Sequence, residues 1–175
     1  PGLLAQECFP VAIAQVCIAA CKKVGVTFDA AIDAGGGPGR SAFEFVKQFK
    51  HTESYDYSQG FIDSLEKHKG QFLDADQVSR LVAYQGDAHK QSEIAKRPHY
   101  NLILGCNLID RLTNPASWVK QCVEQMAPED GVFVVSSPYT WKREHADPEV
   151  WIGGKMKDGK PYHTQDGLVD LVHEY

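Results

Sequence analysis

Four glycines and an acid form the part of this 175-residue sequence best suited to chemistry. They stand in the run DAGGGPG, from Asp33 to Gly39. Glycine lets a backbone turn sharply and approach a ligand closely. The dinucleotide-binding pattern G-x-G-x-x-G fails here, because it needs glycine where the chain has Pro38 or Arg40. The residues that fit a different pattern, acid-x-G-x-G-x-G, are Asp33, Gly35, Gly37 and Gly39.

Two further acids follow the glycine run. Asp56 comes about 20 residues later, where an acid grips ribose hydroxyls in nucleotide-binding folds. Asp87, in the run QGDA, is placed to accept a hydrogen bond from an adenine amino group. Each feature has a plainer alternative: the glycine run as a tight connection, Asp56 as a surface turn residue and Asp87 as a helix N-cap.

Predicted strands and helices alternate along the chain and would position these residues. Strands are predicted over 27–33, 52–57, 80–85, 100–106 and 131–136. Helices are predicted over 10–24, 40–50, 58–69 and 114–127, with a last helix beginning near Thr164 or Asp166. This alternation predicts an α/β fold: a mostly parallel, doubly wound sheet with helices on both faces. Ligands bind such sheets outside the carboxyl ends of the strands.

The glycine pattern resembles motif I of the Rossmann-like class I methyltransferases, which use S-adenosylmethionine. Because this cofactor has no phosphate, a helix N-terminus is free to meet its methionine carboxylate. The acid of the motif would accept from its amino group, directly or through water. The predicted cofactor-binding residues are Asp33, Gly35, Gly37, Gly39, Arg40, Asp56, Tyr57, Asp87, Ala88 and Cys106.

The segment after the fourth predicted strand carries candidate acceptor contacts. Asn107, Asp110 and Arg111 bring an amide, a carboxylate and a guanidinium close together. An amino-acid-like acceptor needs such partners, Arg111 for its carboxylate and Asp110 for its amine. The alternative is a surface ion pair between Asp110 and Arg111.

Aromatic residues follow the fifth predicted strand. Tyr139, Trp141 and Trp151 are predicted to wall off a small acceptor and to shield the sulfonium from water. The alternative is packing against the edge of the sheet. Asp110 and Tyr139 are the candidates for a catalytic base, although an acceptor atom that already has a free lone pair needs little help from one.

Several longer runs are more specific than the glycine loop. They are NLIDRL (107–112), SPYTW (137–141), WIGG (151–154) and DGL (166–168), and they follow DAGGGPGRSAFEF. Over roughly residues 24–170 the sequence resembles the methyltransferase of ovothiol biosynthesis. The resemblance implies N-methylation of the imidazole of 4-mercaptohistidine (5-thiohistidine), by a domain that is fused to a sulfoxide synthase or separate from it.

The chain departs from that family in three places. The family's loop is closer to GCAVGRS, whereas this chain has GGGPGRS, and the acidic stretch expected after SPYTW reads KREHADPE. The sequence also stops at Tyr175, before the two final strands that such domains carry, and opens at Pro1 without a methionine. We therefore expect one methyltransferase domain over 1–175, and whether it lacks an N-terminal segment and its last two strands stays open.

The charge, the hydrophobic pattern and the cysteine spacing argue against several classes of binding partner. A formal net charge of -5 argues against a general nucleic-acid binder. Residues 10–20 are apolar but are interrupted by Gln15, so no membrane helix is expected. The five cysteines show no CxxC spacing, which favours reduced thiols in a cytoplasmic protein and no metal site.

Other functions remain open from sequence alone. A nicotinamide-dependent oxidoreductase is disfavoured by the missing third glycine. Another small-molecule methyltransferase that uses S-adenosylmethionine fits the loop equally well. A non-catalytic subunit that keeps the cofactor fold as an interaction surface is disfavoured by the intact loop with Asp56 and Asp87.

Overall fold

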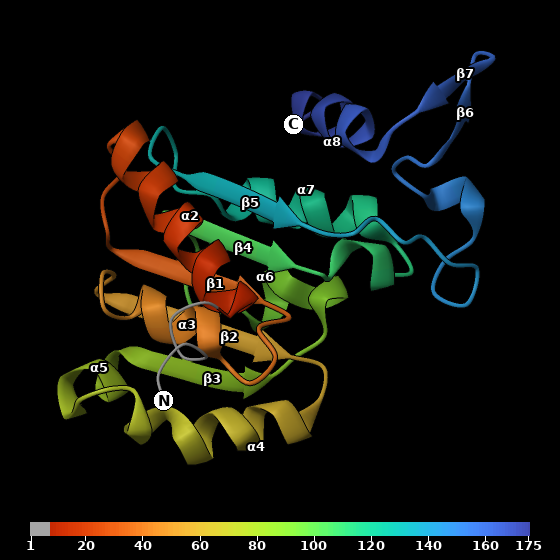
Figure 1. Ribbon diagram of the computed structural model, residues 1–175. Coiled ribbons are helices and arrows are strands. Elements are labelled where there is room, and N and C mark those ends of the chain that lie inside the picture. Colours follow the sequence, from red (N-terminus) through yellow and green to blue (C-terminus); the bar gives the residue numbers. More distant parts are fainter. Residues whose placement is uncertain (1–7) are drawn as a thin grey trace.

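A five-stranded parallel sheet forms the centre of the protein in the computed structural model, which describes residues 8–175 (Figure 1). The strand order is β3-β2-β1-β4-β5. The strands are β1 (Ala30–Ala34), β2 (His51–Asp56), β3 (Leu81–Gln85), β4 (Leu102–Cys106) and β5 (Val132–Ser136). All four pairings are parallel, which confirms the α/β architecture predicted from the alternating pattern.

The first strand begins three residues later than the sequence pattern predicts. Thr27 is held outside the sheet, because its N–H and hydroxyl both donate to the carboxylate of Asp130, at 3.0 and 2.6 Å for the shortest contacts. The sheet pairing starts only at Ala30, and it continues to Ala34. Asp33 therefore lies inside β1 rather than at its end.

Five helices correspond to the predicted ones. They are α2 (Phe9–Val24), α3 (Arg40–Phe45), α4 (Gln59–His68), α7 (Pro115–Gln125) and α8 (Thr164–His173). The predicted helix over 40–50 is too long, because the chain must already turn back toward the sheet. Lys50 N–H donates to Phe28 O at 2.9 Å, one residue before β2 begins.

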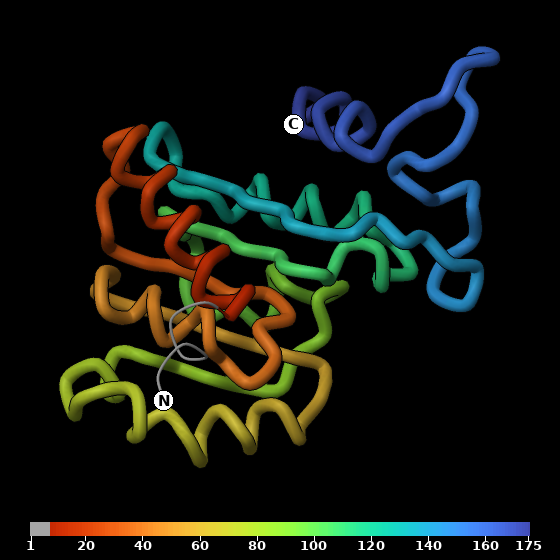
Figure 2. Tube along the Cα trace, viewed as in Figure 1, coloured from red at the N-terminus to blue at the C-terminus, as the bar shows by residue number. Residues whose placement is uncertain are grey.

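Shorter elements were not predicted. They are η1 (Lys69–Gln71), α5 (Ala75–Arg80), η2 (Ala88–Lys90), α6 (Gln91–Ile94), η3 (Ile109–Arg111) and η4 (Pro148–Val150), together with a hairpin of β6 (Lys155–Lys157) and β7 (Lys160–Tyr162). Helix α8 and the hairpin lie beyond the edge strand β5 (Figure 1). The tube in Figure 2 shows the long irregular segment that leads there from β5.

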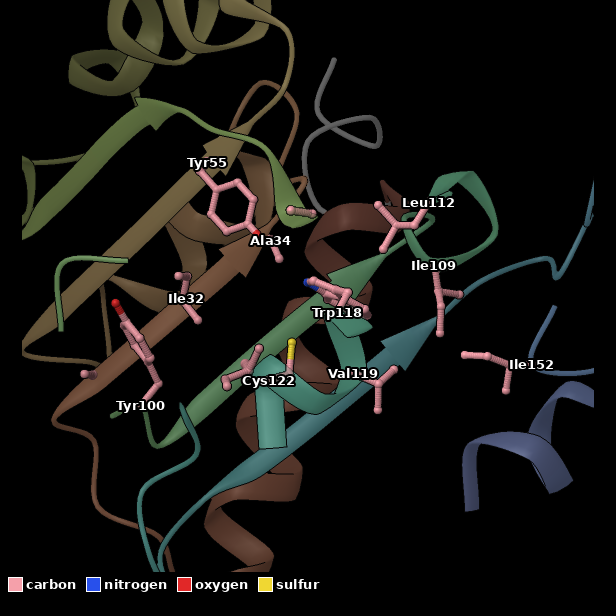
Figure 3. Close-up of a cluster of buried hydrophobic side chains, with 13 residues drawn as sticks. Ile32, Ala34, Tyr55, Tyr100, Ile109, Leu112, Trp118, Val119, Cys122 and Ile152 are labelled. Carbon is pink, nitrogen blue, oxygen red and sulfur yellow. The ribbon is translucent and has the colours of Figure 1, made fainter. Parts of the chain in front are cut away.

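The two faces of the sheet carry separate apolar cores, because side chains of a strand alternate between faces. On one face Ala31, Leu102 and Leu104 pack with α2 and α3. On the other, Ile32 and Ile103 pack with Trp118 and Val119 of α7 (Figure 3). Helices thus cover both faces, and the carboxyl ends of the strands are left open to a ligand.

A buried amide ties the second core together. Gln91 Oε1 accepts from Tyr55 Oη at 2.6 Å and from Trp118 Nε1 at 2.9 Å. Its Nε2 donates to Gln125 Oε1 at 3.0 Å. Figure 3 shows Tyr55 and Trp118 on facing elements of this core. The network fixes β2, α6 and α7 relative to one another beneath the carboxyl ends of the strands.

Within residues 8–175, no helix combines the length and the apolar character that crossing a membrane requires.

Candidate functional site

The main cleft lies at the carboxyl ends of β1 to β4 and has a volume of about 530 Å³. Five of the predicted cofactor-binding residues line it: Gly35, Asp56, Tyr57, Asp87 and Ala88. They come from the loops after three different strands, so the register of the parallel sheet brings them together. Clefts of this size accommodate small molecules and cofactors.

The glycine loop needs glycine for conformational and steric reasons. Gly35, Gly37 and Gly39 have φ of 67°, 55° and 84°, a region that other residues avoid. At Gly36 a Cβ atom would lie 2.3 Å from Ser54 Oγ and 2.7 Å from a carboxylate oxygen of Asp33. The loop therefore packs tightly on the ends of β1 and β2 and leaves its backbone exposed toward the main cleft at Gly35.

Asp33 does not line the main cleft. Its side chain is fully buried beneath Gly36, where it accepts a hydrogen bond from the hydroxyl of Ser41. Burial, reinforced by the nearby charge of Asp56, raises the pKa of Asp33 to about 6, although the Ser41 hydrogen bond works against this. Its other oxygen, Oδ1, has no hydrogen-bond partner among the described residues. Asp33 thus joins the end of β1 to α3, and its predicted contact with the cofactor stays a prediction.

Asp56 lines the main cleft and also holds the glycine loop. Its Oδ2 accepts from Gly37 N–H at 3.0 Å and its Oδ1 accepts from Ser58 N–H at 2.8 Å. Each oxygen retains a second lone pair for a ligand. The neighbouring Tyr57 is 76% exposed and forms an open wall of the same cleft.

Asp87 is the N-cap of the short helix η2, which follows β3, so the N-cap alternative is confirmed. Asp87 also lines the main cleft. Its Oδ1 accepts from His89 N–H at 3.0 Å and contacts His89 Nδ1 at 2.8 Å. The backbone hydrogen bond from His89 is the main reason why the pKa of Asp87 is lowered, so the carboxyl group is ionised and acceptor-only near neutral pH.

Besides Asp33, four predicted cofactor residues lie away from the main cleft. Gly37 donates to Asp56, and Gly39 caps α3 against Leu65. The guanidinium of Arg40 stacks over the ring of Phe72 at 4.2 Å. Cys106 ends β4 half-buried, where burial, followed by the charge of Asp33, raises its thiol pKa to about 11. These four shape the loops or the core around the cleft.

A second cleft, of about 570 Å³, opens at the carboxyl ends of β4 and β5. Two of the predicted acceptor contacts, Asn107 and Arg111, line it together with Phe9 and the run Ser136–Pro138. Asn107 is held at φ 53° by its N–H, which donates to Ser136 O at 2.6 Å. Arg111 also lines the main cleft, so the two clefts share one side chain.

Asp110 is buried between the loops after β4 and β5. It accepts from Ser137 Oγ at 3.0 Å and from the N–H and hydroxyl of Thr140, both at 2.9 Å. Burial alone would raise the pKa of Asp110, but the hydrogen bonds from Thr140 and Ser137 outweigh it and the pKa is lowered. It lines neither cleft, and its predicted catalytic role stays a prediction.

The predicted aromatic wall packs elsewhere. Tyr139, at φ 51°, and Trp141 contact the core beneath α7, and Trp141 stacks on Trp151 at a centroid distance of 6.2 Å. The indole N–H of Trp141 donates to Thr164 Oγ1 at 2.9 Å, and that of Trp151 to Ala146 O at 3.1 Å. None of the three aromatic residues lines the main or the second cleft, and Trp151 lines a separate cavity of about 330 Å³ beside α7 and α8. Their predicted contacts with an acceptor stay a prediction.

Residues that the sequence did not single out also line the main cleft. His89 contacts Thr113 Oγ1 through Nε2 at 2.9 Å and so ties the loop after β3 to the start of α7. Leu108 and His145 line the same cleft, as do Tyr55, Gly86, Leu112 and Thr113. The position of Leu108 directly after the predicted fourth strand was an available signal, whereas His145 lies in an irregular segment with none.

No group of three or more potential metal ligands occurs in the part of the chain that the structure describes.

Comparisons with known proteins identify the fold. Neither a protein-family model nor a curated protein matches the chain. Among solved structures, an S-adenosylmethionine-dependent methyltransferase from Clostridium acetobutylicum superposes with a TM-score of 0.60 at 20% identity, covering 76% of this chain and 52% of its own. The CcbJ methyltransferase from Streptomyces caelestis gives 0.57 at 19% identity, covering 77% and 54%.

A glycopeptide N-methyltransferase solved with S-adenosylmethionine gives a TM-score of 0.57 at 17% identity, covering 70% of this chain and 53% of its own. The chain thus spans about half the length of these structures. The predicted Rossmann-like class I methyltransferase fold is confirmed.

Proposed function

We propose that the protein is an S-adenosylmethionine-dependent methyltransferase. The observation that carries the proposal is the convergence of Gly35, Asp56 and Asp87 on one cleft in a methyltransferase fold. The likeness to a glycopeptide N-methyltransferase that binds the same cofactor supports this donor.

The residues of the main cleft fit the chemistry of this cofactor. Asp56 has free lone pairs for both ribose hydroxyls, and the ionised Asp87 offers an acceptor for the adenine amino group. Tyr57 and Leu108 supply apolar surface for a purine ring. The cofactor, when bound, supplies an activated methyl group on a sulfonium.

We further propose that the acceptor is the imidazole nitrogen of 4-mercaptohistidine and that the product is ovothiol A. The runs NLIDRL and SPYTW, which resemble the ovothiol methyltransferases, support this acceptor. Asn107 and Arg111 of the first run and Ser137 and Pro138 of the second line the second cleft. A sulfoxide synthase, fused or separate, is the expected source of the thiohistidine. We expect the protein to work in the cytoplasm, where its five cysteines stay reduced.

The chain's task in such a reaction is alignment rather than proton transfer. The bound cofactor would supply a methyl group for an in-line displacement by the lone pair of a neutral imidazole nitrogen. The C–S electron pair would stay on sulfur, and the N–H proton of the methylated ring would leave to solvent. Asp56, Asp87 and the glycine loop would fix the donor, and Arg111 would hold the acceptor at the border of the two clefts. Leu108 and Leu112 would help to exclude water.

The decisive experiment is incubation with S-adenosylmethionine and, separately, 4-mercaptohistidine, histidine or a histidine-containing peptide. Mass spectrometry reads the gain of one methyl group. Methylation of 4-mercaptohistidine on nitrogen supports the full proposal. Methylation of histidine but not of its thiol derivative would support a different small-molecule methyltransferase.

Binding without turnover separates the remaining alternatives. Binding of S-adenosylmethionine without methylation of any acceptor tried would overturn the proposed acceptor and would support a non-catalytic subunit with the cofactor fold. An ultraviolet titration with a nicotinamide dinucleotide tests the oxidoreductase, and saturable binding there would overturn the choice of cofactor.

A further inference from the structure

Arg111 stands at the border between the two clefts with most of its hydrogen-bonding capacity unused. Its side chain is 39% exposed, and Nη2 donates to Thr140 Oγ1 at 3.3 Å. The same nitrogen lies 4.0 Å from a carboxylate oxygen of Asp110, which is too far for a direct hydrogen bond. A guanidinium has five N–H donors, so a bidentate face is left for an anion.

Arg111 is also the only charged side chain among the described residues that line the second cleft. The remaining lining is polar but uncharged at Asn107, Ser136 and Ser137, with Phe9 and Pro138 apolar. This combination favours a small polar ligand with a single negative group at the end that meets the main cleft.

The position of Arg111 depends on a buried latch, which we define as Asp110, Ser137 and Thr140. Both carboxylate oxygens of Asp110 are engaged: Oδ1 accepts from Ser137 Oγ, and Oδ2 accepts from the N–H and hydroxyl of Thr140. The Asp110 side chain is fully buried, and Thr140 in turn accepts from Arg111. The latch therefore joins the loops after β4 and β5 and sets the guanidinium between the clefts.

We propose that the second cleft is the acceptor subsite, that it recognises an acceptor through a carboxylate on Arg111, and that Asp110 is a positioning residue for this arginine. The inference rests on the proposed methyltransferase function. Both oxygens of Asp110 are engaged within the latch and its side chain lines neither cleft, so it neither binds the acceptor nor takes a proton from it.

The first test compares ligands that differ only by a carboxylate. Calorimetry of the protein loaded with S-adenosylhomocysteine measures the binding of 4-mercaptohistidine against 4-mercaptohistamine, and of histidine against histamine. A charge-assisted bidentate contact predicts that the carboxylated member of each pair binds about 10- to 100-fold more tightly. Equal affinities within a pair overturn the inference.

Variants of Arg111 test whether this side chain binds the acceptor carboxylate. Arg111→Gln should remove the preference for the carboxylate, and Arg111→Lys should retain part of it as a point charge. Arg143→Gln is the matched control, since Arg143 is an exposed arginine in the segment that follows β5 and lines neither cleft. Cofactor affinity serves as a check that the fold is intact. A preference that survives Arg111→Gln overturns the assignment.

Latch variants separate positioning from proton transfer. Asp110→Asn keeps the shape, because its amide oxygen can accept from Thr140 and its NH₂ can donate to Ser137. We expect its effect to fall on the acceptor KM rather than on kcat, because the latch positions Arg111. Thr140→Val should likewise raise the acceptor KM about tenfold by removing the contact to Arg111. A loss in kcat of about 100-fold for Asp110→Asn at constant KM would make Asp110 a proton acceptor and overturn its positioning role.

These outcomes are distinct from the fate of the proposed function. If 4-mercaptohistidine is methylated but the carboxylate preference is absent, the function stands and the subsite assignment is wrong. If the preference is present but no acceptor is methylated, the subsite stands and the proposed activity is wrong.

Discussion

The replacement of Asp56 by alanine tests the assignment of the main cleft most directly. Both carboxylate oxygens already accept one backbone N–H, from Gly37 and Ser58, and each has one lone pair left for a ribose hydroxyl. A hydrogen bond to a charged group contributes about 1.5–3 kcal/mol. The loss of two such contacts predicts a loss of at least about 3 kcal/mol, or about 150-fold in Kd.

The assay is calorimetric titration with S-adenosylhomocysteine. Asp56→Asn keeps one carbonyl oxygen and should weaken binding by about tenfold. Asp63→Ala is the control, since this acid is exposed on α4 and does not line the cleft. Circular dichroism and the Tm verify that each variant is folded.

A second ligand separates a ribose contact from a general loosening of the glycine loop. The 2′-deoxy analogue of S-adenosylhomocysteine should bind more weakly to the wild type, and Asp56→Ala should discriminate less between the two ligands. If Asp56→Ala binds S-adenosylhomocysteine within about threefold of the wild type, the ribose assignment is refuted. If it binds both ligands weakly but still distinguishes them, Asp56 acts only through the loop.

Three further predictions concern stability. Gly105→Ala should lower the free energy of unfolding by about 3 kcal/mol or more in urea titrations, because the added Cβ would lie 2.2 Å from the Trp118 ring; an unchanged midpoint would refute this packing. Gln91→Leu should cost about 2–4 kcal/mol by leaving Tyr55 and Trp118 without their acceptor, and a neutral effect in the same titration would show that the network is dispensable. The folded-state pKa of Asp33 is raised, so the folded protein holds this proton more tightly than the unfolded chain and loses stability as pH rises from about 4 to 6. The stability of Asp33→Asn relative to the wild type should therefore increase over that interval and level off above it, whereas a pH-independent difference would show that the Asp33 pKa is not raised.

The strands of the sheet and the positions of its loops could be predicted from the sequence, because buried strands and helix caps have recognisable local residue patterns. Asp56 and Asp87 reach the main cleft because each is close to the end of a strand, where the backbone alone determines the location. The position of Asp33 relative to the strand end was less well predicted. It lies one residue before the end of β1, and its side chain accepts from Ser41 of α3 instead of lining the main cleft.

The segment after β5 shows what sequence patterns do not reveal. The direction of Trp141 and Trp151 is set by contacts with residues distant in sequence, such as Thr164, and no periodicity records those contacts. The hairpin of β6 and β7 did have a local signal. Asp158 and Gly159 form a two-residue Asp-Gly turn with positive φ at both positions, which is a strong hairpin pattern.

The backbone of Tyr139 has a consequence for attempts to stabilise the protein. At φ 51° a non-glycine residue stores about 1 kcal/mol or more of conformational strain, and Asn107, on the neighbouring loop, is held in the same region. A search for thermostable variants would therefore favour glycine at these two positions. Both loops border the second cleft, so glycine substitutions that raise the thermal stability would loosen the backbone beside this cleft and would weaken acceptor binding.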